Sequence, residues 1–311
     1  MAEPMKVAYI FPGQGSQKVG MGHDLYDNFD SAKAVFKQAD EVLGFPLSRL
    51  CFEGPEEELR QTINAQPALV TVSFACLKAI GEVDSSRGLP PPAFVAGHSL
   101  GEYTALATAE VIDFATTVYL SRERGRLMHE AGLRQPGGMV AVMGLDEASL
   151  VEVCKETGTL MANINCPEQL VISGAKENLA RAADLTKDRG AYRTIMLPVS
   201  GAFHTPLMQS AVDGMAEIIA NLPFYQPMIP IIANTTARPL TTAEEVKAEL
   251  LSQLCNSIQW QRSIEYMIND GVTTFIEIGP GKVLSGLVKR INRDVEILNI
   301  GDAEAVKRIV C

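Results

Sequence analysis

Short apolar segments alternate with longer segments of helical periodicity along most of the chain. Runs rich in Val, Ile, Phe and Tyr predict buried strands at 6–11, 93–97, 229–233 and 274–278. Segments in which apolar residues recur every three to four positions predict helices at 30–43, 66–80, 100–109, 114–131, 244–254 and 257–269, with another helix after Gly281. Pro67 is expected near the first turn of its helix, where a missing N–H costs little. This alternation is typical of an α/β protein.

The pattern changes between residues 135 and 198. The periodicity here predicts a strand, a helix, two strands, a helix and a final strand, at 139–145, 146–156, 160–165, 169–173, 176–189 and 191–197. The order β-α-β-β-α-β is the ferredoxin-like arrangement. We therefore predict a small ferredoxin-like subdomain at 135–198, inserted into a large α/β domain formed by 1–134 and 199–311.

Composition and charge are those of a globular protein that does not bind polyanions. Hydrophobic residues make up 47% of the chain and charged residues 21%, which is close to the usual balance. The formal net charge of −10 argues against non-specific binding to nucleic acid or to an anionic membrane. We see no signal peptide and expect no segment long and apolar enough to span a bilayer. A cytoplasmic protein that acts as a monomer is expected.

The cysteines and histidines do not suggest a metal site. The chain has four histidines and six cysteines, and no Cys-x-x-Cys pair occurs among Cys51, Cys76, Cys154, Cys166, Cys255 and Cys311. Scattered cysteines of this kind are typical of reduced packing residues. We expect neither a metal ion nor another cofactor.

The motif with the clearest chemistry is Gly97-His98-Ser99-Leu100-Gly101, which matches Gly-x-Ser-x-Gly. It stands between a predicted strand and a predicted helix, which is where the nucleophile of an α/β-hydrolase-like fold is found. The glycines allow a tight turn that pushes the serine hydroxyl out of the sheet. Ser99 is therefore the candidate nucleophile, and the N–H of Leu100, at the start of the helix, is a candidate oxyanion donor.

A serine nucleophile needs a base, and imidazole is the usual one near neutral pH. His98 adjoins Ser99, but neighbouring side chains on such a turn diverge. His129 lies on a charged helical face and His23 in an early polar segment. His204 lies in a loop just after the predicted insertion, where two domains would form a cleft, and is the preferred base. No carboxylate is evident as a third group.

Several motifs in order resemble one family. They are Phe11-Pro-Gly-Gln-Gly-Ser-Gln17, Gly97-His-Ser-Leu-Gly-Glu-Tyr103, Arg124-Gly125, Phe203-His204 and Glu277-Ile-Gly-Pro-Gly281. Together they resemble the malonyl-CoA:acyl carrier protein transacylases of fatty-acid synthesis, to which the acyltransferase domains of polyketide synthases are related. The resemblance extends from the first strand to about Arg290.

The resemblance implies a Ser-His dyad and assigns further residues. A main-chain carbonyl would hold the imidazole of His204, and Gln259 stands at the matching position. The N–H of Gln14 would be the second oxyanion donor. Phe203 resembles the Phe-His form associated with malonyl rather than methylmalonyl groups, although it could also serve only to pack the domains together. The implied substrates are malonyl-CoA and an acyl carrier protein.

The resemblance also singles out Arg124 as the residue that binds the malonyl carboxylate. The sequence alone does not choose between Arg122, Arg124 and Arg126, which could equally form a solvated basic face. The chemistry is reasonable, because a buried carboxylate requires a partner and arginine provides a permanently charged, bidentate one. Hydrogen bonds to charged groups contribute about 1.5–3 kcal/mol, enough to separate malonyl from acetyl groups by one to two orders of magnitude.

The implied partner protein raises a question of charge. Carrier proteins of this type are acidic, and this chain is itself negative. A local basic patch is therefore expected, with Lys282, Lys289, Arg290 and Arg293 as candidates.

Two other functions remain as alternatives. An esterase or thioesterase of the α/β-hydrolase type would share the serine and histidine, but would normally carry an acidic residue between them in the sequence. A non-catalytic docking module would require a defective serine motif, whereas Ser99 and His204 are both present.

Overall fold

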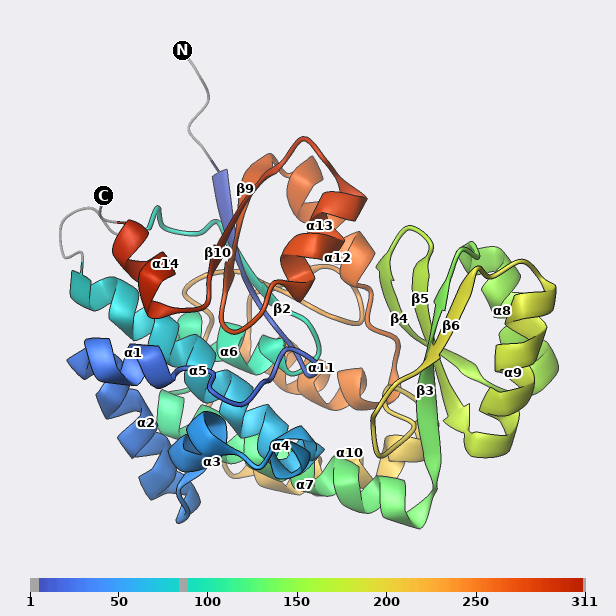
Figure 1. The fold of residues 1–311 in the computed structure, drawn as a ribbon, viewed down its shortest axis with the longest axis horizontal. Helices are drawn as coiled ribbons and strands as arrows, with labels where there is room; N and C mark the ends of the chain where they lie inside the picture. Colours follow the sequence, from blue (N-terminus) through green and yellow to red (C-terminus); the bar gives the residue numbers. More distant parts are fainter. Residues whose placement is uncertain (1–5, 84–88, 310–311) are drawn as a thin grey trace.

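The main body of the molecule is a six-stranded sheet with helices on both faces (Figure 1). The computed structural model describes residues 6–83 and 89–309. The sheet has the order β10-β9-β1-β2-β7-β8, in which β8 pairs antiparallel and every other pair is parallel. Its strands are β1 (Lys6–Phe11), β2 (Phe94–Gly97), β7 (Ile231–Ile232), β8 (Pro239–Leu240), β9 (Val272–Ile278) and β10 (Glu296–Ile300).

Strand β1 shows why both faces of this sheet are covered. Alternate side chains point to opposite faces of a strand. Val7, Tyr9 and Phe11 belong to the larger hydrophobic core, whereas Ala8 and Ile10 belong to a second core on the other face. A central parallel strand buried on both faces is what the uninterrupted apolar run of β1 predicts.

The larger core is formed mainly by the N-terminal helices and the helices that follow the serine motif. These elements are α1 (His23–Asn28), α2 (Asp30–Leu43), α3 (Leu47–Glu53), α4 (Glu56–Arg60), α5 (Thr62–Val83), α6 (Gly101–Thr108), α7 (Phe114–Arg134), α10 (Gln209–Ala220), α11 (Ala243–Cys255) and α14 (Ala303–Arg308), with a 3₁₀ turn, η1, at Pro206–Met208. The second core lies under α12 (Trp260–Asn269) and α13 (Val283–Ile291).

A second, antiparallel sheet stands beside the main body (Figure 1). Its order is β4-β5-β3-β6, and its core of aliphatic side chains lies under two helices. Its elements are β3 (Gly137–Met143), α8 (Glu147–Thr157), β4 (Leu160–Cys166), β5 (Gln169–Ala175), α9 (Lys176–Asp188) and β6 (Arg193–Met196). The order predicted for these elements is confirmed.

The two sheets are joined by hydrogen bonds between backbone groups as well as side chains. Strand β4 forms an isolated bridge with the segment before α12, in which Ile164 N donates to Ile258 O and Ile258 N donates to Ala162 O, both at 2.8 Å. Arg262 of α12 forms an ion pair with Glu147 of α8 at 2.9 Å. The second sheet is therefore fixed to the main body near the end of β4.

Helix α5 begins earlier than its sequence pattern predicts, so Pro67 lies inside the helix rather than near its first turn. A proline within a helix leaves the carbonyl four residues earlier without its usual partner. That carbonyl belongs to Ile63, and the guanidinium of Arg122 donates to it at 2.9 Å. The helix can therefore continue through Pro67 because α7 supplies the missing donor.

Helix α5 also contradicts the expectation that no segment is long and apolar enough to span a bilayer. It has 22 residues and a mean hydropathy of 1.3 over its most apolar window, 83% of which is buried inside the protein. A helix surrounded by other helices is apolar on all sides, and α5 packs against α2, α6 and α7. Its composition is that of a core helix.

Candidate active site

Ser99 lies on a sharp turn between β2 and α6. Its φ angle of 51° places it in the left-handed region, which is unfavourable for a residue with a side chain. A Cβ atom at Gly97 would lie 1.8 Å from the carbonyl carbon of Gly101, and one at Gly101 would lie 2.1 Å from the Phe11 carbonyl oxygen. Both glycines are therefore required by the close approach of backbone segments at this turn.

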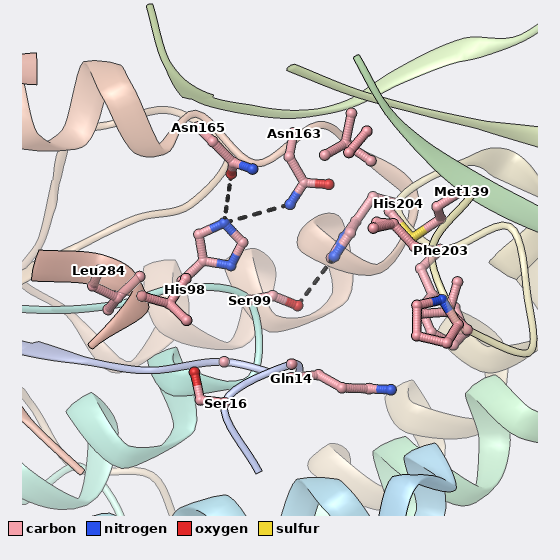
Figure 2. Close-up of a pocket in the computed structure, with 18 of the residues that line it drawn as sticks. Gln14, Ser16, His98, Ser99, Met139, Asn163, Asn165, Phe203, His204 and Leu284 are labelled. Atoms are coloured by element: carbon pink, nitrogen blue, oxygen red, sulfur yellow. Dashed lines mark hydrogen bonds between the residues drawn. The ribbon is translucent and has the colours of Figure 1, made fainter. Parts of the chain in front are cut away.

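His204 lies opposite Ser99, as the sequence predicts. Its Nε2 is 3.0 Å from Ser99 Oγ, and its Nδ1 is 2.6 Å from the backbone carbonyl of Gln253 (Figure 2). Because a carbonyl only accepts, Nδ1 carries the proton and Nε2 has a free lone pair that faces the serine hydroxyl. This tautomer is the one that can receive a proton from Ser99.

The prediction that the Gln259 carbonyl holds His204 is wrong, since the carbonyl of Gln253 occupies that place. Gln259 caps the N-terminus of α12, and its carbonyl accepts the first intrahelical hydrogen bond, from Ser263 N at 2.9 Å. Gln253 lies in the last turn of α11, where helix carbonyls have no intrahelical partner and can accept from a side chain.

The surroundings of His204 strongly favour the neutral imidazole. Burial, together with the positive charge of Arg124, lowers the pKa of His204 to about 3, although the hydrogen bond to Gln253 opposes the shift. The residue is 4% exposed. His204 is therefore an unprotonated base in the free protein.

Arg124 is the arginine that faces the serine. Its guanidinium donates to Ser99 Oγ at 3.0 Å, to Gln66 Oε1 at 2.8 Å and to Gln253 Oε1 at 2.7 Å, and the residue is 1% exposed. Arg122 instead bonds Ile63 O and Asn64, and Arg126 forms ion pairs with Glu123 and Glu130 on the helix surface. Of these three arginines, Arg124 is the one whose guanidinium contacts Ser99 Oγ.

The two predicted oxyanion donors lie on the loop after β1 and at the start of α6. The backbone N–H groups of Gln14 and Leu100 donate no hydrogen bond to any described residue. Gln14 lines the same cavity as Ser99, on the loop after β1 (Figure 2), and Leu100 is the N-cap of α6. Both N–H groups therefore remain unpaired within the described chain.

His98 points away from Ser99 and bonds the second sheet. Its Nε2 lies 2.8 Å from Asn165 Oδ1 and 3.5 Å from Asn163 Nδ2, and its ring stands edge-on to Trp260 (Figure 2). Burial lowers the pKa of His98. His98 thus connects the serine turn to β4, and neither asparagine was identified from the sequence.

The cavity above Ser99 lies between the second sheet and the main body and has a volume of about 270 Å³. Phe203, next to His204, is buried and lines it. The wall from the second sheet includes Met139, Ala141, Asn163, Asn165, Gln169 and Val171, and the wall from α13 includes Val283, Leu284 and Leu287. The cavity is mostly apolar apart from the Ser99 end.

The described residues contain no group of three or more His, Cys, Asp or Glu side chains that could hold a metal ion. The five cysteines of the described ranges are free, and Cys311 lies outside those ranges.

The fold and the site define an acyl transferase. The family model for the acyl transferase domain matches residues 8–308, which is nearly the whole chain.

Comparison with individual proteins shows which group of acyl transferases the chain resembles in sequence and structure. The chain is 45% identical over 307 residues to the malonyl CoA-acyl carrier protein transacylase of Bacillus subtilis, covering 97% of this chain and 95% of the relative, and 41% identical to that of Staphylococcus aureus, covering 97% of each. It resembles the acyl-carrier-protein S-malonyltransferase structure from Bartonella henselae with a TM-score of 0.93 and 39% identity, over 98% of both chains. This chain belongs to the malonyl CoA-acyl carrier protein transacylases.

Proposed function

We propose that this protein transfers a malonyl group from malonyl-CoA to the phosphopantetheine thiol of an acyl carrier protein, through a malonyl ester on Ser99. The observation that carries the proposal is the position of Ser99 Oγ, which lies 3.0 Å from His204 Nε2 and 3.0 Å from a nitrogen of Arg124. One hydroxyl thus contacts both a neutral base and a cation that can bind a carboxylate.

The first half of the reaction forms the ester. The malonyl carboxylate pairs with Arg124, which places the thioester carbonyl beside Ser99. Ser99 attacks the carbonyl carbon while His204 Nε2 takes the hydroxyl proton. The backbone N–H groups of Gln14 and Leu100 stabilise the oxyanion, each such donor contributing about 3 kcal/mol. His204 then gives its proton to the departing CoA thiolate, and the C–S bond breaks.

The second half reverses these steps. The carrier protein's thiol loses its proton to His204 and attacks the malonyl ester, and His204 returns the proton to Ser99 as the C–O bond breaks. Because CoA leaves before the thiol binds, the kinetics should be ping-pong. The carbonyl of Gln253 supports the imidazolium formed in each half, taking the place of a triad carboxylate.

Arg124 and Phe203 together account for the choice of acyl group. A bound malonyl group gives the buried guanidinium of Arg124 the carboxylate partner that it lacks in the free protein. An acetyl group has no carboxylate and cannot supply one. The Phe203 ring lines the cavity beside His204 and would crowd an α-methyl branch. Malonyl groups are therefore favoured over acetyl and methylmalonyl groups.

Intact-mass measurement after incubation with malonyl-, methylmalonyl- and acetyl-CoA tests this function. The unsubstituted protein should gain one malonyl group, and Ser99→Ala should gain none. Arg124→Ala should lower the malonyl loading rate about 10–100-fold, as expected for the loss of hydrogen bonds to a charged group, and should reduce the preference over acetyl-CoA. Absence of any adduct on the unsubstituted protein would contradict the proposal.

Product analysis separates transfer from hydrolysis. With an acyl carrier protein present, we expect malonyl carrier protein as the main product, and free malonate as the main product would instead identify a thioesterase. A structure of a type II polyketide carrier protein bound to its malonyl-transacylase is also similar to this chain, with a TM-score of 0.92 and 39% identity over 98% of each chain. Fatty-acid and polyketide carrier proteins should therefore both be assayed.

We further propose that the chain forms two subdomains. The β-α-β-β-α-β order and the strand order β4-β5-β3-β6 support a ferredoxin-like subdomain at 135–198, and the parallel sheet with its serine turn supports an α/β-hydrolase-like domain at 1–134 and 199–311. A monomer in the cytoplasm remains our expectation for the protein as a whole.

A further inference from the structure

Glu102 is the residue of the serine motif that takes no part in the chemistry above. It lies in the first turn of α6, three residues after Ser99, and is 0% exposed. A carboxylate removed from water is costly unless other groups compensate its charge. No ion pair between described residues includes Glu102.

Hydrogen-bond donors surround Glu102 instead. Its Oε1 accepts from the backbone N–H of Asn234 at 3.1 Å and from Asn234 Nδ2 at 2.9 Å, and its Oε2 accepts from Gln253 Nε2. Burial and the nearby Glu249 carboxylate raise the pKa of Glu102 well above its ordinary value, although these donors oppose the shift. Because every one of these contacts is a donor, the arrangement satisfies the ionised carboxylate.

These contacts fix the orientation of the Gln253 side chain. With its NH₂ group turned to Glu102, its carbonyl oxygen faces Arg124 and accepts from the guanidinium at 2.7 Å. A guanidinium can only donate. The opposite orientation would place the NH₂ group of Gln253 against the donors of Arg124.

The same logic applies to Asn234. Its NH₂ group bonds Glu102 and the Gly97 carbonyl, and its oxygen accepts the Ser99 backbone N–H at 2.8 Å. Glu102 therefore orients two amides, one of which holds the backbone of Ser99 and the other the guanidinium of Arg124.

Arg124 is a buried cation without a carboxylate in direct contact. No described Asp or Glu forms an ion pair with it, and its Nε is buried without a hydrogen-bond partner. Burial lowers the pKa of Arg124, and electrostatic interactions with Tyr103 and Glu102 oppose the shift. The carboxylate of Glu102 and the guanidinium of Arg124 are thus separated by the side-chain amide of Gln253, which contacts both.

We propose that Glu102 is the positioning residue and counter-charge of Arg124, and that the Gln253 amide between them leaves the guanidinium free to pair with the carboxylate of the incoming acyl group. The inference rests on the proposed function, because it assigns to Arg124 a carboxylate substrate. A carboxylate in direct contact with Arg124 would compete with that substrate. A neutral residue at position 102 would leave the buried cation uncompensated.

The first test is Glu102→Gln, compared with Glu277→Gln. Glu277 is also a fully buried carboxylate. It accepts from two backbone N–H groups and a hydroxyl, where Glu102 accepts from one backbone N–H group and two side-chain amides, and it caps α13 and forms no hydrogen bond with Arg124 in the described structure. In Glu102→Gln, the new NH₂ group must face either Asn234 or Gln253, which are both donors. We expect kcat/KM for malonyl-CoA to fall about tenfold or more, and the ratio of malonyl to acetyl loading to fall with it. Glu277→Gln should lose stability but keep that ratio unchanged.

The decisive test is the exchange Glu102→Gln with Gln253→Glu. In this variant the amide oxygen at position 102 can accept from Asn234, and the amide NH₂ group can donate to the new carboxylate at position 253. That carboxylate can also accept from Arg124, so the donors of Asn234 and Arg124 are satisfied, and only the 3.5 Å contact from Gln253 Nε2 to the Ser99 carbonyl is lost. The backbone carbonyl that holds His204 is unchanged. We expect thermal stability to recover relative to Glu102→Gln, whereas KM for malonyl-CoA stays raised about tenfold because Arg124 now contacts a carboxylate directly.

Two results would overturn the inference. One is a Glu102→Gln protein with the malonyl-to-acetyl ratio of the unsubstituted protein. The other is an exchange variant whose KM for malonyl-CoA returns to the unsubstituted value, which would show that Glu102 serves only to satisfy hydrogen bonds. Failure of the unsubstituted protein to form an adduct contradicts the proposed function instead. In that case crystal structures of the variants decide, since an Arg124–Gln253 contact that survives Glu102→Gln also overturns the inference.

Discussion

Ser99 and His204 both have a backbone conformation that is unfavourable for residues with side chains, with φ angles of 51° and 61°. Such conformations cost of order 1–3 kcal/mol each and persist only where the surroundings hold them. At Ser99 the surroundings are the glycines of the turn and the hydrogen bond from its N–H to Asn234. The position of the hydroxyl is therefore maintained by backbone contacts rather than by the serine itself.

The turn should not tolerate a methyl group at Gly101. In Gly101→Ala, the new Cβ would lie 2.1 Å from the Phe11 carbonyl oxygen, so β1 and α6 would have to separate. We expect a loss of about 1–3 kcal/mol in the free energy of unfolding, measured by urea denaturation, together with slower loading of Ser99. Gly81→Ala, in α5, is the control, since its Cβ meets no atom within 4 Å. It should be neutral or stabilise by about 0.5–1 kcal/mol, and equal losses in both variants would contradict this account.

The pH dependence of acylation should reflect the unusual environment of His204. Protonated imidazole cannot accept the serine proton, so the loading rate is lost as pH falls through the pKa of His204, which is about 3. We expect single-turnover loading by malonyl-CoA to be constant between about pH 5 and about pH 8. An imidazole with the ordinary pKa of about 6.5 would instead lose activity already below neutral pH, and a midpoint near that value would contradict the prediction.

At the scale of elements, the sequence predicts best where local pattern and burial agree. The strand at 6–11 and the helix at 30–43 have the predicted bounds, because β1 is uniformly apolar and α2 has one apolar face. Strand β10 was not predicted, since it has only five residues and its polar and apolar positions do not alternate regularly. Strand β7 is reduced to Ile231–Ile232 by the Pro residues and turns around it.

At the candidate site, too, residues in distinctive motifs could be predicted from the sequence, whereas contacts formed only by the tertiary structure could not. Ser99 and His204 lie in distinctive motifs, and the structure brings them within hydrogen-bonding distance. The carbonyl that holds His204 carries no side-chain signature, so Gln259 could not be distinguished from Gln253 by residue type. Asn163 and Asn165 reach His98 only because β4 pairs with the segment before α12, which is a tertiary contact.

The substitutions Arg122→Ala, Arg124→Ala and Arg126→Ala, all in α7, should have different effects because each side chain contacts a different part of the protein. Arg122→Ala removes the donor to the Ile63 carbonyl that Pro67 leaves unpaired in α5, and should lower the free energy of unfolding by about 1–3 kcal/mol. Arg126→Ala removes surface ion pairs and should cost less than about 1 kcal/mol. Urea denaturation measures both. Neither should alter the malonyl-to-acetyl loading ratio, and a changed ratio in Arg122→Ala would contradict the assignment of Arg124.

At the scale of the whole molecule, a net charge of −10 must be reconciled with an acidic partner. Lys282, Lys289, Arg290 and Arg293 are all exposed around α13, which lines the cavity. Arg290 also donates to the Pro167 carbonyl of the second sheet, and Lys289 to the Val295 carbonyl. Lys282 and Arg293 are therefore the members of the patch best suited to substitution.

Charge reversal at Lys282 and Arg293 should slow transfer to the carrier protein without slowing loading by malonyl-CoA, because long-range attraction affects association more than chemistry. Transfer rates at increasing salt concentration measure the effect, which should shrink as salt screens the charges. Lys37→Glu, on exposed α2 away from the cavity, is the matched control. Unchanged transfer by the double variant would refute the patch.

The cavity has one wall on the second sheet and another on α13 of the main body, and this has a consequence for how selectivity can change. Its width depends on how the two lobes are held together, so the bridge between Asn163 and Ile258 and the ion pair between Arg262 and Glu147 act as spacers. Residues that do not contact the acyl group can thus change which branched or longer acyl groups fit into the cavity. New acyl preferences can arise through substitutions at these contacts while Ser99, His204 and Arg124 stay the same.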